Sequence, residues 1–147
     1  MSLDHIGSAT TPVLATVSLT GELHDAAAAR LLRWCEARLH LHDSGEAAIS
    51  HLLIDLGRVR HADLCAVAIL DHARTEAERR RVGSYLIGAG PLMAAAPPQV
   101  RHRLGRWRSF PTLDVARAVL NPTGAAAGHG PVDPDAIVLL PNPHDRL

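Results

Sequence analysis

Strand-like and helix-like segments alternate along this chain, and that alternation constrains the fold more than any other feature. Three short apolar runs have the length of buried or half-buried strands: Val13–Leu19, His51–Leu56 and Ser84–Ala89. Between and after them, apolar residues recur at three- and four-residue steps, as on one face of a helix: Ala26–Leu41, Ala66–Arg81, Gln99–Trp107 and Leu113–Leu120, with a short extended piece at Ser109–Thr112. This order predicts an α/β domain with helices packed against a mainly parallel sheet.

The turns between these segments indicate where a site could lie, because loops that join strands to helices commonly carry binding residues. Thr20-Gly21-Glu22 is expected to end the first strand, and Asp25 resembles the N-cap of the helix that follows. Gly57–His61 is expected to connect the second strand to the next helix. Asp63 can cap a helix beginning at Leu64 or act as a functional carboxylate, and both roles are compatible.

Length and composition divide the chain into three parts. Its 147 residues favour a single domain. We expect a flexible N-terminus over residues 1–11, the folded domain over 12–121 and a tail over 122–147 that is rich in Gly, Ala and Pro. Ile137–Leu140 is an apolar patch within that tail, suited to docking onto the domain or a partner.

Charge and hydropathy argue against several functional classes. The formal net charge is +0 and all fifteen basic residues are arginines, so the domain lacks the overall basic character of a nucleic-acid binder. The arginine clusters at residues 79–81 and 101–108 are interpreted as solvated helix faces in preference to phosphate contacts.

The sequence has neither a secretory signal nor an apolar run long enough to span a bilayer. We therefore expect a cytoplasmic protein with free thiols at Cys35 and Cys65.

Four segments resemble one known family, the STAS domains of sulfate transporters and anti-sigma factor antagonists. Val17–Leu23 resembles the family's V-x-L-x-G-E-L-D opening, and Leu52–Leu70 resembles its central apolar strand followed by D-S-S-G. Pro98–Leu104 resembles the P-x-V-R-R-x-L stretch, and Thr112–Leu120 resembles the closing helix. The resemblance covers about residues 12–120.

The resemblance implies a STAS-like fold, with a small mixed or parallel sheet and helices mostly on one side. It also implies a non-catalytic interaction module of a bacterial partner-switching system that regulates transcription. Such an antagonist binds an anti-sigma factor that is also a GHKL-type serine kinase. Phosphorylation of the first serine of D-S-S-G ends that binding.

This chain departs from the family pattern at the phosphoacceptor. Leu64 occupies the position of the first serine, Cys65 the second, and Ala66 the position of the glycine. Leucine has no hydroxyl group, so this position cannot be phosphorylated. His24 replaces the aspartate of the opening motif, and Asp25 follows it. The resemblance assigns partner binding to two short segments: Glu22, His24 and Asp25, and Asp63, Leu64, Cys65 and Ala66.

Alternative functions remain open at the level of sequence. The domain could sense a ligand or serve as a structural subunit of a larger complex, including a homo-oligomer. Cys65 with His61 nearby could be a reactive pair, and His61, Asp63 and Cys65 alternate as metal ligands sometimes do. We favour neither, because the sequence shows no nucleophile and base arrangement, phosphate loop or paired metal motif. We expect no enzyme activity, cofactor, metal or nucleic acid, and no membrane partner.

Overall fold

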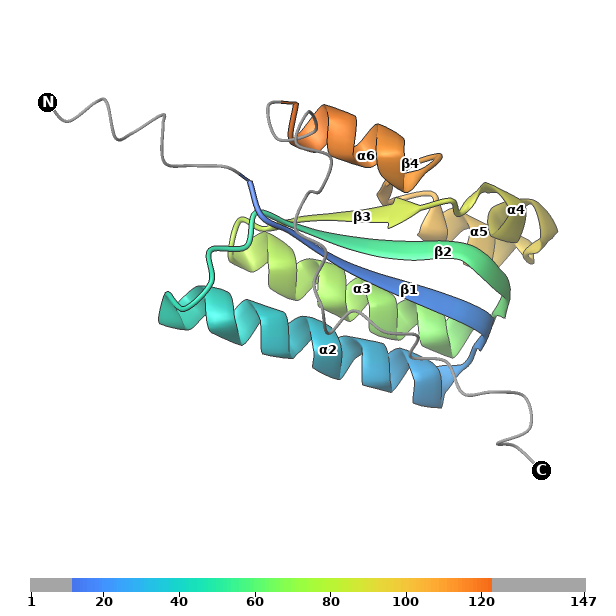
Figure 1. Ribbon diagram of the computed structural model, residues 1–147. Helices are drawn as coiled ribbons and strands as arrows, with labels where there is room; N and C mark the ends of the chain where they lie inside the picture. The colour runs from blue at the N-terminus through green and yellow to red at the C-terminus, as the bar shows by residue number, and fades with distance from the viewer. Residues whose placement is uncertain (1–11, 123–147) are drawn as a thin grey trace, which may run out of the picture.

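The structure is a computed structural model that describes residues 12–122. Its strands and helices alternate as the sequence predicts (Figure 1). The strands are β1 (Leu14–Leu23), β2 (His51–Ala62), β3 (Gly83–Ile87) and β4 (Arg108–Phe110). The helices are α2 (Asp25–Ser44), α3 (Leu64–Arg79), α4 (Gly90–Ala95), α5 (Pro98–Leu104) and α6 (Leu113–Leu120).

The four strands form one parallel sheet in the order β1-β2-β3-β4. Each strand therefore lies next to the one that follows it in the chain. Crossovers between parallel strands are right-handed, so successive crossovers in one direction place their helices on the same face. Figure 1 shows this result, with α2 and α3 side by side beneath the sheet. The predicted α/β fold with helices mostly on one side is confirmed.

The main core lies between the sheet and the layer of α2, α3 and α5. Leu52, Ile54 and Leu56 of β2 point into this layer and are almost fully buried. Cys35 of α2 is fully buried, as expected for a small core residue. Trp34 is also buried in this core, so α2 contributes its apolar face over most of its length.

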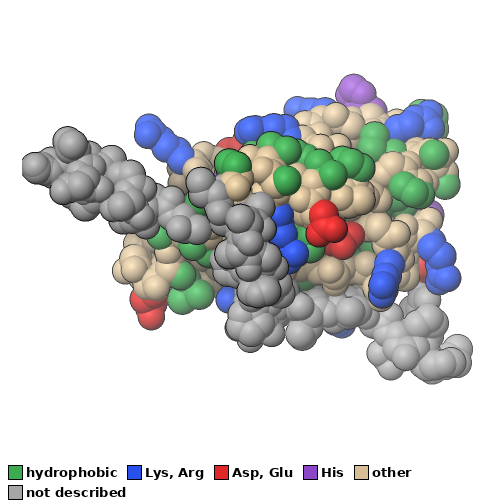
Figure 2. Space-filling view, turned by 45° about the horizontal axis from the view of Figure 1, so that its top comes forward, with side chains coloured by type: hydrophobic (Ala, Val, Ile, Leu, Met, Phe, Trp, Pro, Cys, Tyr) green, Lys and Arg blue, Asp and Glu red, His purple; other side chains and the backbone are tan. Residues whose placement is uncertain are grey.

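A smaller core covers the opposite face of the sheet. Leu14, Leu53, Tyr85 and Ile87 pack there against α6, with Ala116 fully buried at the contact. Figure 2 shows this face of the molecule, with arginines and acidic side chains scattered among apolar ones. Both faces of β2 are thus covered over its first half, as its continuous apolar sequence predicts.

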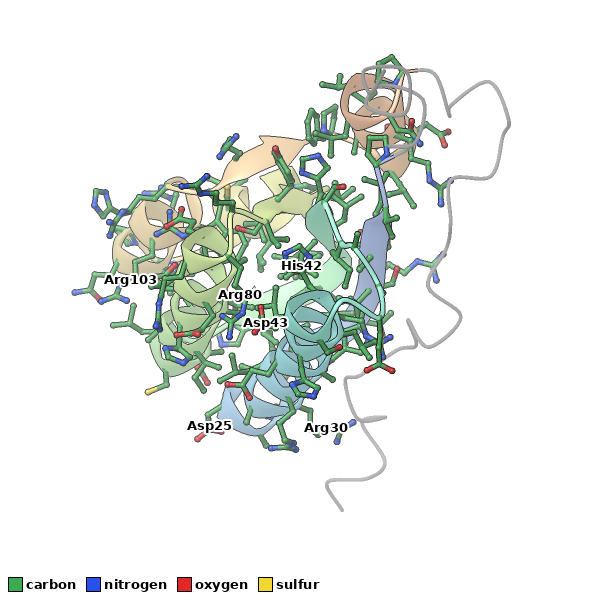
Figure 3. All side chains as sticks on the ribbon, turned by 90° about the vertical axis from the view of Figure 1, so that its left-hand side faces the viewer. Asp25, Arg30, His42, Asp43, Arg80 and Arg103 are labelled. Carbon is green, nitrogen blue, oxygen red and sulfur yellow. The ribbon has the colours of Figure 1, made fainter. Side chains whose placement is uncertain are left out.

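An ion pair joins α2 to α3 on the outer surface of the helix layer. Arg80, just after α3, reaches Asp43 of α2 at 2.9 Å and Glu76 of α3 at 3.0 Å. Figure 3 shows Arg80 and Asp43 pointing toward each other between the two helices. Hydrogen bonds from Arg80 hold the pKa of Glu76 below its usual range. The ion pair adds a polar contact to the apolar packing between the two helices.

The first two strands are longer than the sequence suggests. Two expectations are wrong: Thr20-Gly21-Glu22 continues β1, and Gly57–His61 continues β2 instead of connecting it to a helix. The register shifts after Ser18 and again after Gly21, and at each shift β2 contains one extra residue. These bulges change the spacing of buried residues in β2 from two to three. The usual strand alternation is lost there, which explains why the sequence reads as a loop.

Other boundaries also differ from expectation. The N-cap of α2 is His24, not Asp25: His24 has an extended backbone and accepts a hydrogen bond from the Ala27 N–H. Asp25 is the first helical residue, and its carboxylate accepts from the Ala26 N–H at 2.8 Å. Helix α3 begins at Leu64 and ends at Arg79, two residues before the expected end at Arg81. Helix α4 is an element that the sequence does not predict. Helix α5 begins at Pro98, one residue before the expected segment, and ends at Leu104 instead of Trp107. The bounds of α6 agree with the prediction.

Candidate docking surface

The first turn of α3 presents the residues that the sequence singles out. The backbone N–H of Ala66 donates a hydrogen bond to the Asp63 carboxylate at 2.7 Å. Asp63 is therefore the N-cap of α3, a role that contributes about 1 kcal/mol to stability. The cap leaves the next two side chains on the surface, since Leu64 is 41% exposed and Cys65 is also exposed.

The first turn of α2 lies beside it at the same end of the sheet. His24 accepts a hydrogen bond from the Ala27 backbone through Nδ1 at 3.4 Å. The backbone N–H of Asp63 donates to the Leu23 carbonyl at 3.2 Å, which ties the two helix starts together. The two segments that the family resemblance assigns to partner binding are thus adjacent in space (Figure 1).

The predicted site residues differ in how accessible they are. Glu22 and Asp25 are exposed, whereas His24 and Asp63 are partly buried by their capping roles. Ala66 is fully buried and supports the surface from beneath. We call the exposed parts of His24, Asp25, Asp63, Leu64 and Cys65 the docking surface.

A two-stranded ribbon carries both helix starts. It consists of residues 20–23 of β1 paired with residues 58–62 of β2, beyond the last residue of β2 that pairs with β3. Val59 and Ala62 point inward, while Arg58, Arg60 and His61 are exposed. Regular alternation from the inward Val59 would turn residue 61 inward as well, and the bulge places His61 outward instead.

An open groove borders the ribbon. It has a volume of about 450 Å³ and is lined by residues 57–60 of β2 together with Pro91 and Leu92 of α4. The sequence places residues 57–60 on the expected contact surface, which we expect to centre on Gly57–Val67 and the nearby Gly21–Asp25 loop. It gives no indication of Pro91 and Leu92, because α4 has no clear periodic pattern.

The alternative chemistries gain no support from the geometry. Within residues 12–122, no three His, Cys, Asp or Glu side chains converge as metal ligands would. No hydrogen bond between the described residues joins His61 to Cys65. Burial raises the pKa of the Cys35 thiol to about 12, so Cys35 stays protonated and unreactive at neutral pH.

Comparison with known proteins identifies the family. The STAS domain family matches residues 5–106, which is more than half of the chain, so this protein belongs to the STAS domain family. The match begins before the described residues and ends before β4 and α6, which continue the same folded unit.

A solved structure supports the same fold. The crystal structure of a sulfate transporter family protein from Wolinella succinogenes superimposes with a TM-score of 0.55 at 21% sequence identity. The alignment covers 80% of this chain and 94% of that chain. At this level of identity, the likeness establishes the shared fold. No curated protein matches the sequence.

STAS domains generally act by binding other proteins or ligands and not by catalysis, and this chain has the fold of that class. Among residues 12–122, no helix has both the length and the apolar character needed to cross a bilayer.

Proposed function

We propose that this domain is an anti-sigma factor antagonist homologue whose docking surface cannot be switched off by phosphorylation. Its partner would be an anti-sigma factor with GHKL-type serine kinase activity, in a cytoplasmic partner-switching system. One observation carries the proposal. The position that the family uses as phosphoacceptor is an exposed leucine at the N-terminus of a capped helix.

The surroundings of Leu64 favour binding to a partner protein over a role in catalysis. Its side chain is one of few large apolar groups exposed in the described part of the chain, and an exposed apolar group ringed by polar ones is typical of an interface centre. The exposed Arg58, Arg60 and His61 lie on the neighbouring ribbon. They favour a partner surface with an apolar centre and an acidic edge.

The proposal predicts a complex that persists in ATP. Purified domain and a purified anti-sigma kinase from the same genome would be mixed with ADP or ATP, and binding measured by calorimetry. Wild-type domain should bind equally in both nucleotides, and mass spectrometry should find no phosphate on it. Leu64→Ser restores a hydroxyl group, so this variant should gain phosphate and dissociate in ATP.

A charged side chain at residue 64 provides a second test of the proposal. Phosphoserine adds about −1.5 to −2 charges, and Leu64→Glu mimics part of that effect without harming the helix start, where acidic residues are favourable. We expect Leu64→Glu to weaken binding by at least about tenfold, because it places a charge at the apolar centre of the interface. Val119→Glu is the matched control, since Val119 is 58% exposed on α6. Absence of binding by both wild type and Leu64→Ser would overturn the antagonist function.

A further inference from the structure

A small pocket rich in arginine lies far along α3 from the docking surface. It is lined by Arg74 and Glu78 of α3, by Ser84 of β3 and its two preceding residues, and by Arg106 and Arg108 around the start of β4. Arg74 is ten residues after Leu64, which corresponds to about 15 Å along a helix. The pocket and the docking surface are therefore separate parts of the molecule.

The pocket carries an excess of positive charge. Three arginines line it and Glu78 is its one carboxylate, although the chain as a whole has a formal net charge of +0. By contrast, Arg80 outside the pocket meets the two carboxylates Asp43 and Glu76 at 2.9 and 3.0 Å. A local surplus of guanidinium groups in a concave site attracts anions.

The three arginines are poorly neutralised by carboxylates. Arg74 lies 3.9 Å from Asp71 and 4.0 Å from Glu78, both at the outer limit of an ion pair. Its Nε atom is buried and has no hydrogen-bond partner in the described part of the chain. Neither Arg106 nor Arg108 forms an ion pair within residues 12–122. Both are exposed, so their guanidinium donors are open to an oxyanion in the pocket, and its negative charge would also offset the positive charge of Arg74.

Aromatic rings hold two of these guanidinium groups in place. Arg74 lies over the Trp107 ring at 5.6 Å, and Arg108 lies over the Tyr85 ring at 5.3 Å. Arg108 also donates a hydrogen bond to the Tyr85 hydroxyl oxygen at 3.4 Å. Stacked arginines lose little further freedom when they bind an anion, so the site is partly preorganised.

The size of the pocket limits the ligand. Its volume is about 120 Å³, and roughly 10–15 Å³ suffices for one water molecule. The space therefore suits a phosphate-sized group and not a large organic molecule. Planar guanidinium groups recognise the oxygens of phosphate and sulfate by paired hydrogen bonds.

We propose that the pocket formed by Arg74, Arg106, Arg108 and Ser84 binds a small tetrahedral oxyanion, either free or as the end of a phosphomonoester. This inference goes beyond the proposed function and does not depend on it, because the pocket lies away from the docking surface. It assigns the domain a ligand site of its own.

The test is an NMR titration of the ¹⁵N-labelled protein at low ionic strength. Inorganic phosphate, sulfate and ribose 5-phosphate would be added separately, with sodium chloride as the reference salt. We expect saturable shifts of the Ser84 amide and of arginine Nε resonances with the oxyanions. Tighter binding of inorganic phosphate than of ribose 5-phosphate would identify the free ion as ligand, and the reverse would identify a phosphomonoester.

Three pocket variants and one control variant make the test specific. Arg106→Gln and Arg108→Gln change exposed side chains, so folding should be preserved, and each should weaken binding by about tenfold. Glu78→Gln removes the opposing charge and should strengthen binding. Arg101→Gln, an exposed arginine on α5 outside the pocket, is the matched control and should leave affinity unchanged. Shifts that chloride reproduces, or that Arg101→Gln reduces as much as Arg106→Gln, would overturn the site.

Discussion

Gly88 occupies a backbone conformation that other residues rarely adopt. Its φ is +67°, in the left-handed region, and a Cβ atom there would lie 3.1 Å from the Cα of Gly57. Its N–H donates a hydrogen bond to the Phe110 carbonyl at 2.9 Å, so the turn cannot relax without loosening β4. The close approach of two glycines thus joins the end of β3 to the middle of β2.

Gly88→Ala should therefore destabilise the protein. The left-handed conformation alone costs about 1–2 kcal/mol for a residue with a Cβ atom, and the close contact adds to this. Urea unfolding followed by circular dichroism measures the change in the free energy of unfolding. Gly90→Ala is the matched control, because a Cβ at Gly90 meets nothing within 4 Å. Equal losses in the two variants would contradict the role given to Gly88.

Helix α5 is attached to α3 and the sheet by apolar packing and by one carboxylate. Val100 and Leu104 of α5 are buried in the main core. Asp71 of α3 accepts a hydrogen bond from the Trp107 indole Nε1 at 3.1 Å and another from Arg103 at 3.2 Å. The Asp71 side chain is 17% exposed and that of Arg103 is 41% exposed, so the indole contact is the better shielded from water. Since α5 has only seven residues, it is too short to be stable by itself and depends on these contacts.

Asp71→Ala should cost about 1–3 kcal/mol of unfolding free energy, because it leaves the buried indole N–H without an acceptor. Asp71→Asn keeps one oxygen acceptor and should cost less. Thermal and urea unfolding measure both losses, with Glu36→Ala on the exposed face of α2 as the control. If the asparagine variant is as unstable as the alanine variant, the charge on Asp71 and not its acceptor role holds α5.

The elements themselves show where sequence reasoning succeeds. Helix α6 is predicted with its observed bounds because Thr112 caps it, Asp114 lies in its first turn and Asn121-Pro122 follows it. The cap at Asp63 is likewise evident from the sequence, as an aspartate directly before an apolar run. Both are local features, decided by residues within one turn of each other.

The failures have a non-local cause. Residues 58–61 form a strand only because they pair with residues 20–22 of β1, 38 to 39 positions away in the chain (58 minus 20, 61 minus 22). Helix α4 has six residues and forms against β2. The arginine pocket likewise combines residues from α3, β3 and β4, so no single segment of sequence could reveal it.

The whole domain should unfold as one unit. Trp34 of α2 and Trp107 beyond α5 are buried in the same main core, although 73 positions separate them (107 minus 34). Cooperative unfolding of a small domain exposes all parts of such a core together. Within residues 12–122, the smaller core beneath α6 uses the same strands β1, β2 and β3 as the main core, so we expect it to unfold with the rest of the domain.

Urea unfolding of Trp34→Phe and Trp107→Phe tests this, because each variant keeps one fluorescent reporter. The two fluorescence transitions should each coincide with the circular dichroism transition of the same variant. A fluorescence transition of either tryptophan at lower urea than the loss of helix would show that its part of the domain opens first.

The two bulges in β2 also determine which residues of the ribbon can be substituted without disturbing the core. Between Leu56 and Ala62, every third side chain is buried and the two between them face water. A regular strand of the same length would alternate, and so would offer fewer outward positions. The ribbon therefore separates the side chains that pack in the core from those that face water. Substitutions at Arg58, Arg60 and His61 can change the surface of the ribbon while Val59 and Ala62 keep its packing.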